Sequence, residues 1–120
     1  MKYMLLIYGN QEKWSSIPAE TWPEAIAKQD AFNKKYQGTG ELLGAYGLAD
    51  AAAARLVRRT DGTPAVTDGP YLETKEYLAS FYLLDCENEQ RAYEIAADMP
   101  WADVEPVEVW PVLHEAAADL

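Results

Sequence analysis

Two helix-forming stretches, each lying between apolar strand-forming runs, constrain the fold of this chain more than any other feature. The first run, Tyr3–Tyr8, is apolar and aromatic, ends at Gly9-Asn10 and is typical of a central strand. A second strong strand is predicted for Tyr77–Cys86 and the last one for Pro106–Val112. The chain therefore places a helix after its first strand and another before its last.

The first helix is predicted from Thr21 to about Gln37, after a polar loop that contains Trp14. Thr21 as N-cap and Glu24 three residues later have the spacing of a capping box, and Gly38 ends the helix. The apolar residues recur at spacings of three and four, which predicts one buried stripe. That stripe consists of Trp22, Ala25, Ile26, Gln29, Phe32 and Tyr36.

The second helix is predicted from Asn88, a good N-cap, to Met99, where Pro100 closes it. Its inward face has the same helical spacing. The residues expected on that face are Ala92, Ile95, Ala96 and Met99.

The middle of the chain predicts a short strand and a hairpin. The strand is Leu42–Leu48, and Arg55–Thr60 pairs with Thr63–Thr67 across the tight-turn sequence Asp61-Gly62. Between them, the stretch Asp50–Ala54 fits either a helical turn or a small loop, because five residues are too few for periodicity to decide.

Without the hairpin, the predicted order is β-α-β-β-α-β, an α+β ferredoxin-like arrangement. It places both helices on one face of an antiparallel sheet and leaves an aromatic face open. A second copy of the chain would cover that face, so we expect a homodimer, a dimeric α+β barrel. All 120 residues are predicted to form one domain, with an ordered core over 1–113 and a fraying acidic tail over 114–120.

Charge limits the classes of partner. The chain has 20 acidic and 10 basic residues, a net charge of −10, which repels phosphate backbones and argues against direct nucleic-acid binding. Arg55, Arg58 and Arg59 are close in sequence, and we interpret them as one edge strand on an acidic protein.

The compartment is predicted from the single cysteine and the N-terminus. Cys86 excludes a disulfide within the chain, and its acidic neighbours should raise the pKa of its thiol and lower its reactivity. The apolar N-terminal run is too short for a signal peptide, and no stretch is long enough to span a membrane. We therefore expect a soluble, cytoplasmic protein without a membrane partner.

The segment Val66–Glu76 reads V-T-D-G-P-Y-L-E-T-K-E. It resembles the signature V-T-D-G-P-F-x-E-T-K-E of the DGPF-domain proteins, which are grouped with the YCII-related proteins. Only the phenylalanine differs, and it is Tyr71 here. The opening strand, Phe81–Leu84, Ala92–Pro100 and Val107–Pro111 also match, so the resemblance extends over nearly the whole chain.

The resemblance implies the dimeric ferredoxin-like fold but no settled activity. Relatives in the YCII branch carry a histidine and an aspartate associated with enzymatic chemistry. Asp68 corresponds to that aspartate, whereas the histidine has no counterpart, because His114 lies beyond the last predicted strand. Family members also occur fused to sigma-70-type factors, which implies a sigma factor as a possible partner.

Two departures from the family pattern affect the expected pocket. The usual E-V-R-P near the end is Glu108-Val109-Trp110-Pro111, so an aromatic surface replaces an anion-binding arginine. The paired glycines that often follow the motif are Ala79 and Ser80, which narrow the space for a ligand or a partner backbone.

Asp68-Gly69-Pro70 has two interpretations. In the structural one, Asp68 binds downstream amides, Gly69 allows a positive φ and Pro70 fixes the next φ of a sharp turn. In the functional one, Asp68 is a rigid carboxylate beside Tyr71, and burial in an apolar cavity would make it a general acid or base.

Other residues complete the candidate site. Lys75 is expected either to pair with an acid across a dimer interface or to attract an anionic ligand as part of a lid. Buried tyrosine hydroxyls need partners, so Tyr8 and Tyr82 are expected to line a small-molecule pocket. No metal site is predicted from one histidine and one cysteine, and no cofactor is expected.

Three functions are compatible with these residues. The first is a small-molecule-binding protein, or a cofactor-free enzyme acting on a small organic substrate, with a pocket at the motif. The second is a non-catalytic interaction module that acts on a sigma factor or another regulator. The third is a degenerate relative that keeps the fold and has lost the site.

Overall fold

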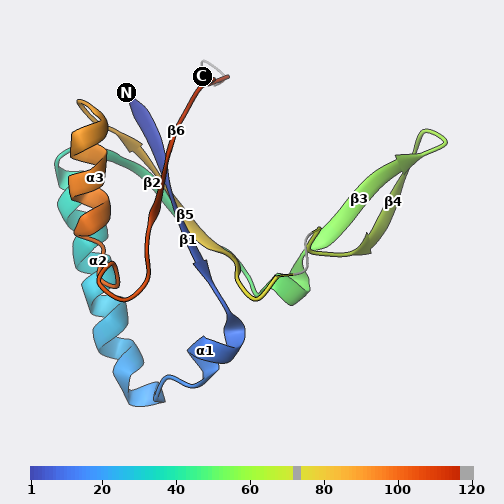
Figure 1. The fold of residues 1–120 in the computed structure, drawn as a ribbon, viewed down its shortest axis with the longest axis horizontal. Coiled ribbons are helices and arrows are strands. Elements are labelled where there is room, and N and C mark those ends of the chain that lie inside the picture. The colour runs from blue at the N-terminus through green and yellow to red at the C-terminus, as the bar shows by residue number, and fades with distance from the viewer. Residues whose placement is uncertain (72–73, 117–120) are drawn as a thin grey trace.

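The computed structural model describes residues 1–71 and 74–116. Its main sheet has the strand order β2-β5-β1-β6 (Figure 1). These strands are β1 (Lys2–Gly9), β2 (Leu42–Gly47), β5 (Tyr77–Asp85) and β6 (Glu108–Pro111). Every pairing in the sheet is antiparallel. The predicted α+β, ferredoxin-like β-α-β-β-α-β order with an inserted hairpin is therefore confirmed.

The register of the sheet separates its two faces. Leu5 of β1 lies opposite Tyr82 of β5 on one side and Val109 of β6 on the other. Leu5 and Tyr82 are buried under the helices, and Val109 packs against the same core. Their neighbours along each strand therefore point to the opposite, open face.

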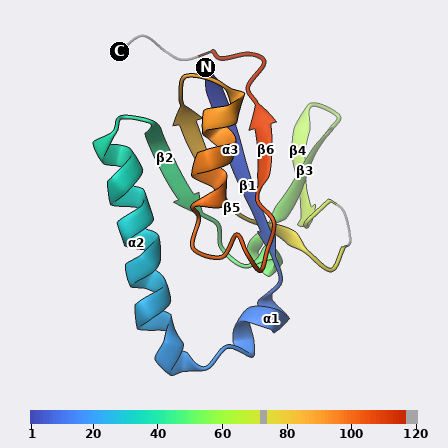
Figure 2. The same ribbon diagram turned by 60° about the vertical axis from the view of Figure 1, so that its left-hand side comes forward.

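Two long helices cover one face of the sheet, α2 (Trp22–Gly38) and α3 (Glu89–Ala97) (Figure 2). The Asn88 side chain accepts a hydrogen bond of 2.9 Å from the Arg91 amide, so the predicted N-cap of α3 is confirmed. The inward face predicted for this helix is also confirmed. Its buried residues are Ala92, Ile95 and Ala96, and Met99 is buried two residues beyond the end of the helix at Ala97, so α3 is shorter than the predicted Asn88–Met99.

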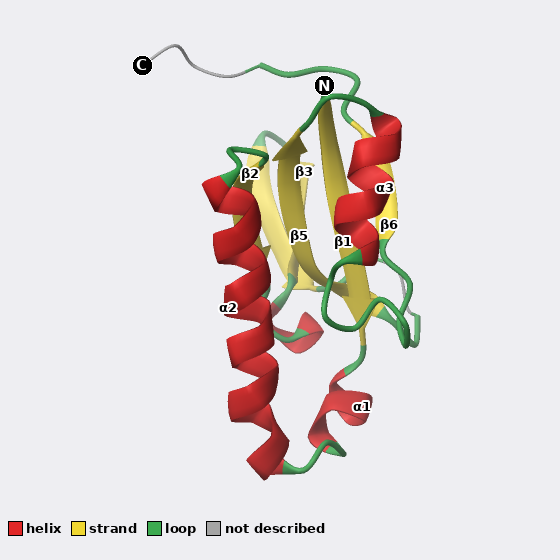
Figure 3. Ribbon diagram, turned by 90° about the vertical axis from the view of Figure 1, so that its left-hand side faces the viewer, coloured by secondary structure: helices red, strands yellow, loops and turns green. Residues whose placement is uncertain are grey.

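The stripe predicted along α2 is correct only for its C-terminal half. Phe32 and Tyr36 are buried, whereas Trp22 is at the surface and Ile26 is 57% exposed. The N-terminal half is exposed because the helix is longer than the sheet: the start of α2 extends past the end of the sheet, toward the turn that contains Trp14 (Figure 3). The residues at the start of this helix therefore have little sheet beneath them.

The predicted capping box at Thr21 is wrong. A 3-10 turn, η1 (Ala19–Thr21), runs directly into α2, so Thr21 has helical backbone angles instead of the extended ones of an N-cap. Its hydroxyl donates a hydrogen bond of 2.7 Å to the Pro18 carbonyl.

Two short elements refine the predicted loops. The loop that contains Trp14 is partly helical, α1 (Gln11–Ser15), and the Asn10 side chain caps it by accepting a 2.8 Å hydrogen bond from the Lys13 amide. The alternatives left open before the hairpin resolve into a 3-10 turn, η2 (Ala51–Ala53).

The hairpin of β3 (Arg55–Thr60) and β4 (Thr63–Asp68) forms a separate sheet that projects from the body as an arm (Figure 1). Asp61 and Gly62 both have positive φ, which confirms the predicted tight turn. The radius of gyration is 16.7 Å, against roughly 14 Å for a compact chain of this length. The arm accounts for this extended shape.

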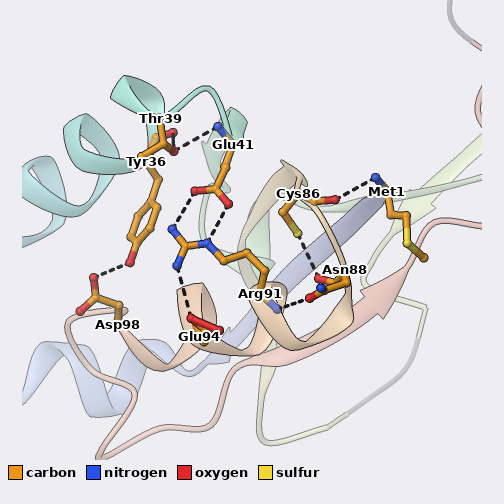
Figure 4. A network of polar contacts seen from close by, with 9 residues as sticks. All are labelled: Met1, Tyr36, Thr39, Glu41, Cys86, Asn88, Arg91, Glu94 and Asp98. Atoms are coloured by element: carbon orange, nitrogen blue, oxygen red, sulfur yellow. Dashed lines mark hydrogen bonds and ion pairs between the residues drawn. The ribbon is translucent and has the colours of Figure 1, made fainter.

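A polar network joins the C-terminal end of α2, the residue before β2 and the helix α3 (Figure 4). Arg91 donates two hydrogen bonds of 2.8 and 2.9 Å to the Glu41 carboxylate, and the Tyr36 hydroxyl donates one of 2.7 Å to Asp98. Nearby, burial followed by the Glu41 charge raises the pKa of the Cys86 thiol. The direction agrees with the prediction but the cause differs, because burial and Glu41 come first, and of the adjacent acids only Asp85 contributes, as the smallest cause.

The ends of the chain differ slightly from the prediction. The last strand is shorter than Pro106–Val112, and β5 ends one residue before Cys86. Of the predicted tail, residues 117–120 lie outside the described residues, and Glu115 forms an ion pair with Lys2. Within the described residues, no helix has both the length and the apolar character needed to span a membrane.

Candidate functional site

Two hollows meet where β1 ends, and both are lined in part by Gly9 and Trp14. One, which we call the motif hollow, lies beside the DGP segment and measures about 610 Å³. The other, which we call the tryptophan cavity, lies beside the start of α2 and measures about 290 Å³. Both volumes are in or near the range of small-molecule sites.

Gly9 allows this arrangement because the Trp14 indole lies directly against its backbone. A Cβ atom placed on Gly9 would lie 2.1 Å from Cζ2 of Trp14, far inside normal contact. The chain turns at Asn10 into α1, which carries the indole back over the end of β1. The contact with Gly9 and the capped turn therefore hold the Trp14 side chain in place, next to both hollows.

Polar and apolar groups from several segments line the motif hollow. Pro70 and Lys75 come from the family motif, Tyr77 from the start of β5, and Asn10 and Asp50 from the turns before α1 and η2. The Thr74 amide donates a hydrogen bond of 3.4 Å to the Tyr77 hydroxyl, which ties the motif segment to the sheet. Of the predicted site residues, Lys75 and Pro70 therefore line the same hollow.

Gly69 has a different role from the one predicted. Its φ is not positive; instead its amide donates a 3.0 Å hydrogen bond to the Ala54 carbonyl. A Cβ on Gly69 would lie 3.1 Å from the Ala54 carbonyl carbon. The motif glycine is explained by close approach of two backbones at the base of the arm.

Asp68 and Tyr71 point into solvent. The Asp68 side chain is 97% exposed, and its carboxylate lies 3.9 Å from Nε of Arg55. Among the described residues no downstream amide donates to this carboxylate, since the Gly69 amide donates to the Ala54 carbonyl and Pro70 has no amide hydrogen. Tyr71 is also exposed. The apolar enclosure that the acid–base hypothesis required is not formed within one copy of the described chain.

The two predicted tyrosines lie in different surroundings. Tyr82 is buried in the core, with its ring centre 6.1 Å from that of Phe32, and burial raises the pKa of its hydroxyl. Tyr8 contributes to the tryptophan cavity. Burial and, after it, the nearby Glu108 carboxylate raise the pKa of the Tyr8 hydroxyl. The structure does not bring Tyr8 and Tyr82 together.

The tryptophan cavity was missed by sequence reasoning. Trp14, Trp22 and Trp101 surround it, and Gln29 of α2 adds an amide. Each tryptophan comes from a separate segment, and a local pattern predicted core packing for only one of them. The signal available was compositional, since four tryptophans in 120 residues is a high content and three of them flank short turns or a helix start.

The open face of the sheet is apolar. Tyr46 of β2 stacks on Phe81 of β5 at 5.0 Å between ring centres, and Trp110 of β6 is 56% exposed. Trp110 stands where the family pattern has arginine, and its indole NH donates a 2.9 Å hydrogen bond to Glu108. In residues 1–71 and 74–116, no group of three metal-ligating side chains comes together.

Comparison with known proteins agrees with the motif. A sequence model of the YCII-related domain matches residues 1–115. The chain is also similar to a protein of Rhizobium meliloti (strain 1021) described as uncharacterized. The two are 33% identical over 99 residues, which cover 82% of this chain and 80% of that protein.

Proposed function

We propose that this chain, which belongs to the YCII-related domain family, binds a small organic molecule in the motif hollow. The observation that carries the proposal is the convergence of Lys75 and Pro70 of the family motif with Tyr77, Asn10 and Asp50 on one hollow. A few polar groups placed around a concave surface are typical of ligand sites.

The charges of the hollow indicate the kind of ligand. Among the residues that the structure describes, the hollow is lined by one cation, Lys75, and by the carboxylates Glu12 and Asp50. The other nearby lysine, Lys13, is already paired with Glu76 at 2.9 Å and with Glu105 at 3.6 Å. A small carboxylic acid that also bears a hydrogen-bond donor, such as an amino-acid derivative, complements this arrangement.

The test is a thermal-shift screen of small carboxylic acids, amino-acid derivatives, lactones and phenols. A ligand present at about a hundred times its dissociation constant adds about 2.7 kcal/mol of stability, which shifts the melting temperature by several degrees. We expect Lys75→Met to abolish the shift given by an acid and Lys34→Met, an exposed change on α2, to retain it. An acid whose shift survives Lys75→Met, or a blank screen, would refute the proposal.

A catalytic role for Asp68 is a separate proposal, which needs more than one copy of the chain provides. Because the Asp68 carboxylate is in water, acid–base chemistry would require a second copy or a bound ligand to cover it. Without such cover, we expect Asp68→Asn to leave the ligand-induced shift unchanged. Loss of the shift in Asp68→Asn would instead place this carboxylate in the site.

We also propose that a second copy covers the open face of the sheet, giving the homodimer. Its support is the aromatic surface of Tyr46, Phe81 and Trp110, which nothing in the described chain covers. Trp110→Glu should convert dimer to monomer in sedimentation velocity, whereas Trp101→Glu, outside this face, should not. A wild-type protein that is monomeric at high micromolar concentration would refute the dimer.

The projecting arm favours a second candidate, a module that binds a regulator such as a sigma factor. Val57 and Val66 are paired across the hairpin, and their exposed fractions are 65% and 61%. They adjoin Arg58 and Arg59, also exposed, on an otherwise acidic protein. Calorimetry with a purified sigma-70-type factor tests this candidate. Val57→Asp should abolish the heat of binding, and absence of heat with wild type would eliminate the candidate.

A further inference from the structure

The tryptophan cavity has features of a second binding site that the motif does not explain. Its walls come from separate segments: the end of β1, the turn with α1, the start of α2 and the loop before β6. Trp22 and Trp101 remain partly exposed at its rim although both are large and apolar. Apolar surface left in water costs free energy that an apolar occupant would recover.

The size of the cavity limits its occupant. A cavity of about 150 Å³ in another protein holds one benzene ring. The tryptophan cavity, at about 290 Å³, has about twice that volume and accommodates two fused rings. Three indoles provide flat faces, and aromatic rings pair with them in offset or edge-to-face geometry.

Polar groups of the lining define the ligand further. Gln29 uses its amide nitrogen to donate a 3.0 Å hydrogen bond to Asn33, and within the described residues nothing donates to its carbonyl oxygen. That oxygen can accept a hydrogen bond from a hydroxyl or an NH group of a ligand.

The charges near the cavity are paired with one another. Lys13 bridges Glu76 of the motif segment and Glu105 of the loop before β6. The hydrogen bond from Lys13 to Glu76, with the charge of Glu105, raises the pKa of the Lys13 ammonium, which therefore stays charged at neutral pH. Lys13 is therefore already paired with two carboxylates, which leaves little positive charge at this cavity to attract an anionic ligand.

We propose that the tryptophan cavity binds a neutral, flat aromatic molecule of about two fused rings that carries one hydrogen-bond donor. The site is distinct from the carboxylic-acid site proposed at the motif hollow, although Trp14 lines both. The donor bonds to Gln29, and the rings lie among Trp14, Trp22 and Trp101.

Isothermal titration with 2-naphthol tests this site. Ala25 lines the cavity on α2, and Ala25→Leu should fill part of the space and weaken binding at least tenfold. Ala27→Leu, on the exposed side of the same helix, is the matched control and should bind like wild type. Lys75→Met should also bind like wild type, which separates this site from the motif hollow.

Two further measurements address the polar part of the proposal. Gln29→Met keeps the size of the side chain and removes the acceptor, so binding of 2-naphthol should weaken roughly three- to tenfold, as expected for one neutral hydrogen bond. Naphthalene-2-carboxylate should bind at least tenfold more weakly than 2-naphthol, because its charge would meet Glu105 and an already paired Lys13, and because it has no donor for the Gln29 carbonyl.

Several outcomes would overturn the proposal. The first is that wild type does not bind 2-naphthol up to its solubility limit. The second is that Ala25→Leu and Ala27→Leu bind 2-naphthol with equal affinity. The third is that 2-naphthol and naphthalene-2-carboxylate bind with equal affinity. If circular dichroism shows that Ala25→Leu is unfolded, Gln29→Met decides, and unchanged affinity in that variant overturns the proposed role of the amide and with it the ligand class.

Discussion

Replacing Gly9 with alanine should displace the indole that lines both hollows. The added Cβ would lie 2.1 Å from Cζ2 of Trp14, and ordinary contact begins at 3.4 Å, so the ring must move by at least 1.3 Å. Overpacking of this kind costs about 1–3 kcal/mol. Urea unfolding followed by circular dichroism should therefore show a lower midpoint with an unchanged slope.

A matched glycine separates this clash from the general effect of adding a methyl group. Gly38 lies at the end of α2, where a Cβ would meet nothing within 4 Å. Gly38→Ala should be neutral or stabilise by about 0.4–1 kcal/mol, because alanine loses less conformational entropy on folding. Tryptophan emission should change in Gly9→Ala alone, and binding of 2-naphthol should weaken with it. If Gly9→Ala is as stable as wild type and keeps its emission spectrum, the argument that Trp14 is held against Gly9 is wrong.

Two other predictions concern the packing of α3. Ile95 is fully buried, so Ile95→Ala should lower the unfolding free energy by about 2–5 kcal/mol in urea titrations, whereas Glu94→Ala on the exposed side should change it far less. The hydrogen bonds from Arg91 hold the pKa of Glu41 below its usual range. A depressed folded-state pKa stabilises the fold above the unfolded value of about 4.3, and this stabilisation is lost as pH falls through the lower folded value. The urea midpoint should thus decrease as the pH is lowered from 5 to 3, and it should decrease more steeply in wild type than in Glu41→Gln. An equal dependence of the midpoint on pH in both proteins would show that the Arg91–Glu41 pair has no such linkage.

The elements that local sequence determines could be predicted well. Asn88 caps its own helix through the Arg91 amide, and Asp61-Gly62 turns its own hairpin, so both are encoded within a few residues. The inward face of α3 follows from helical spacing because the whole helix lies over the sheet. The order of strands and helices was sufficient to predict the ferredoxin-like arrangement.

The prediction of a buried stripe along α2 was wrong in the N-terminal half of the helix, where tertiary context decides which residues are buried. Spacing predicts which residues share a side of a helix, but it does not tell how far the sheet extends beneath them. Ile26 and Phe32 satisfy the same pattern, yet Phe32 is buried and Ile26 is exposed. The missed half of the helix is also the part that borders the tryptophan cavity.

The candidate site was predicted only in part, for a related reason. Pro70 and Lys75 were expected at a pocket because of the motif, and they line one. Trp14 and Trp101 were not assigned to the site, because they are far apart in sequence and meet only through the fold. Gly9 was taken as the end of a strand, and its contact with Trp14 depends on the short helix α1, which was predicted as a loop.

The position of Trp14 has a thermodynamic consequence for the two proposed sites. Because one indole lines both hollows, a ligand that moves the ring in one hollow changes the shape of the other. Lys13 adds a second connection, since it pairs with Glu76 of the motif segment and with Glu105 beside the tryptophan cavity. Linkage requires that any such effect be reciprocal, so a carboxylic acid that alters the affinity for 2-naphthol must have its own affinity altered by the same factor. Two separate titrations would then measure one coupling free energy between the hollows, carried by Trp14 and Lys13 together.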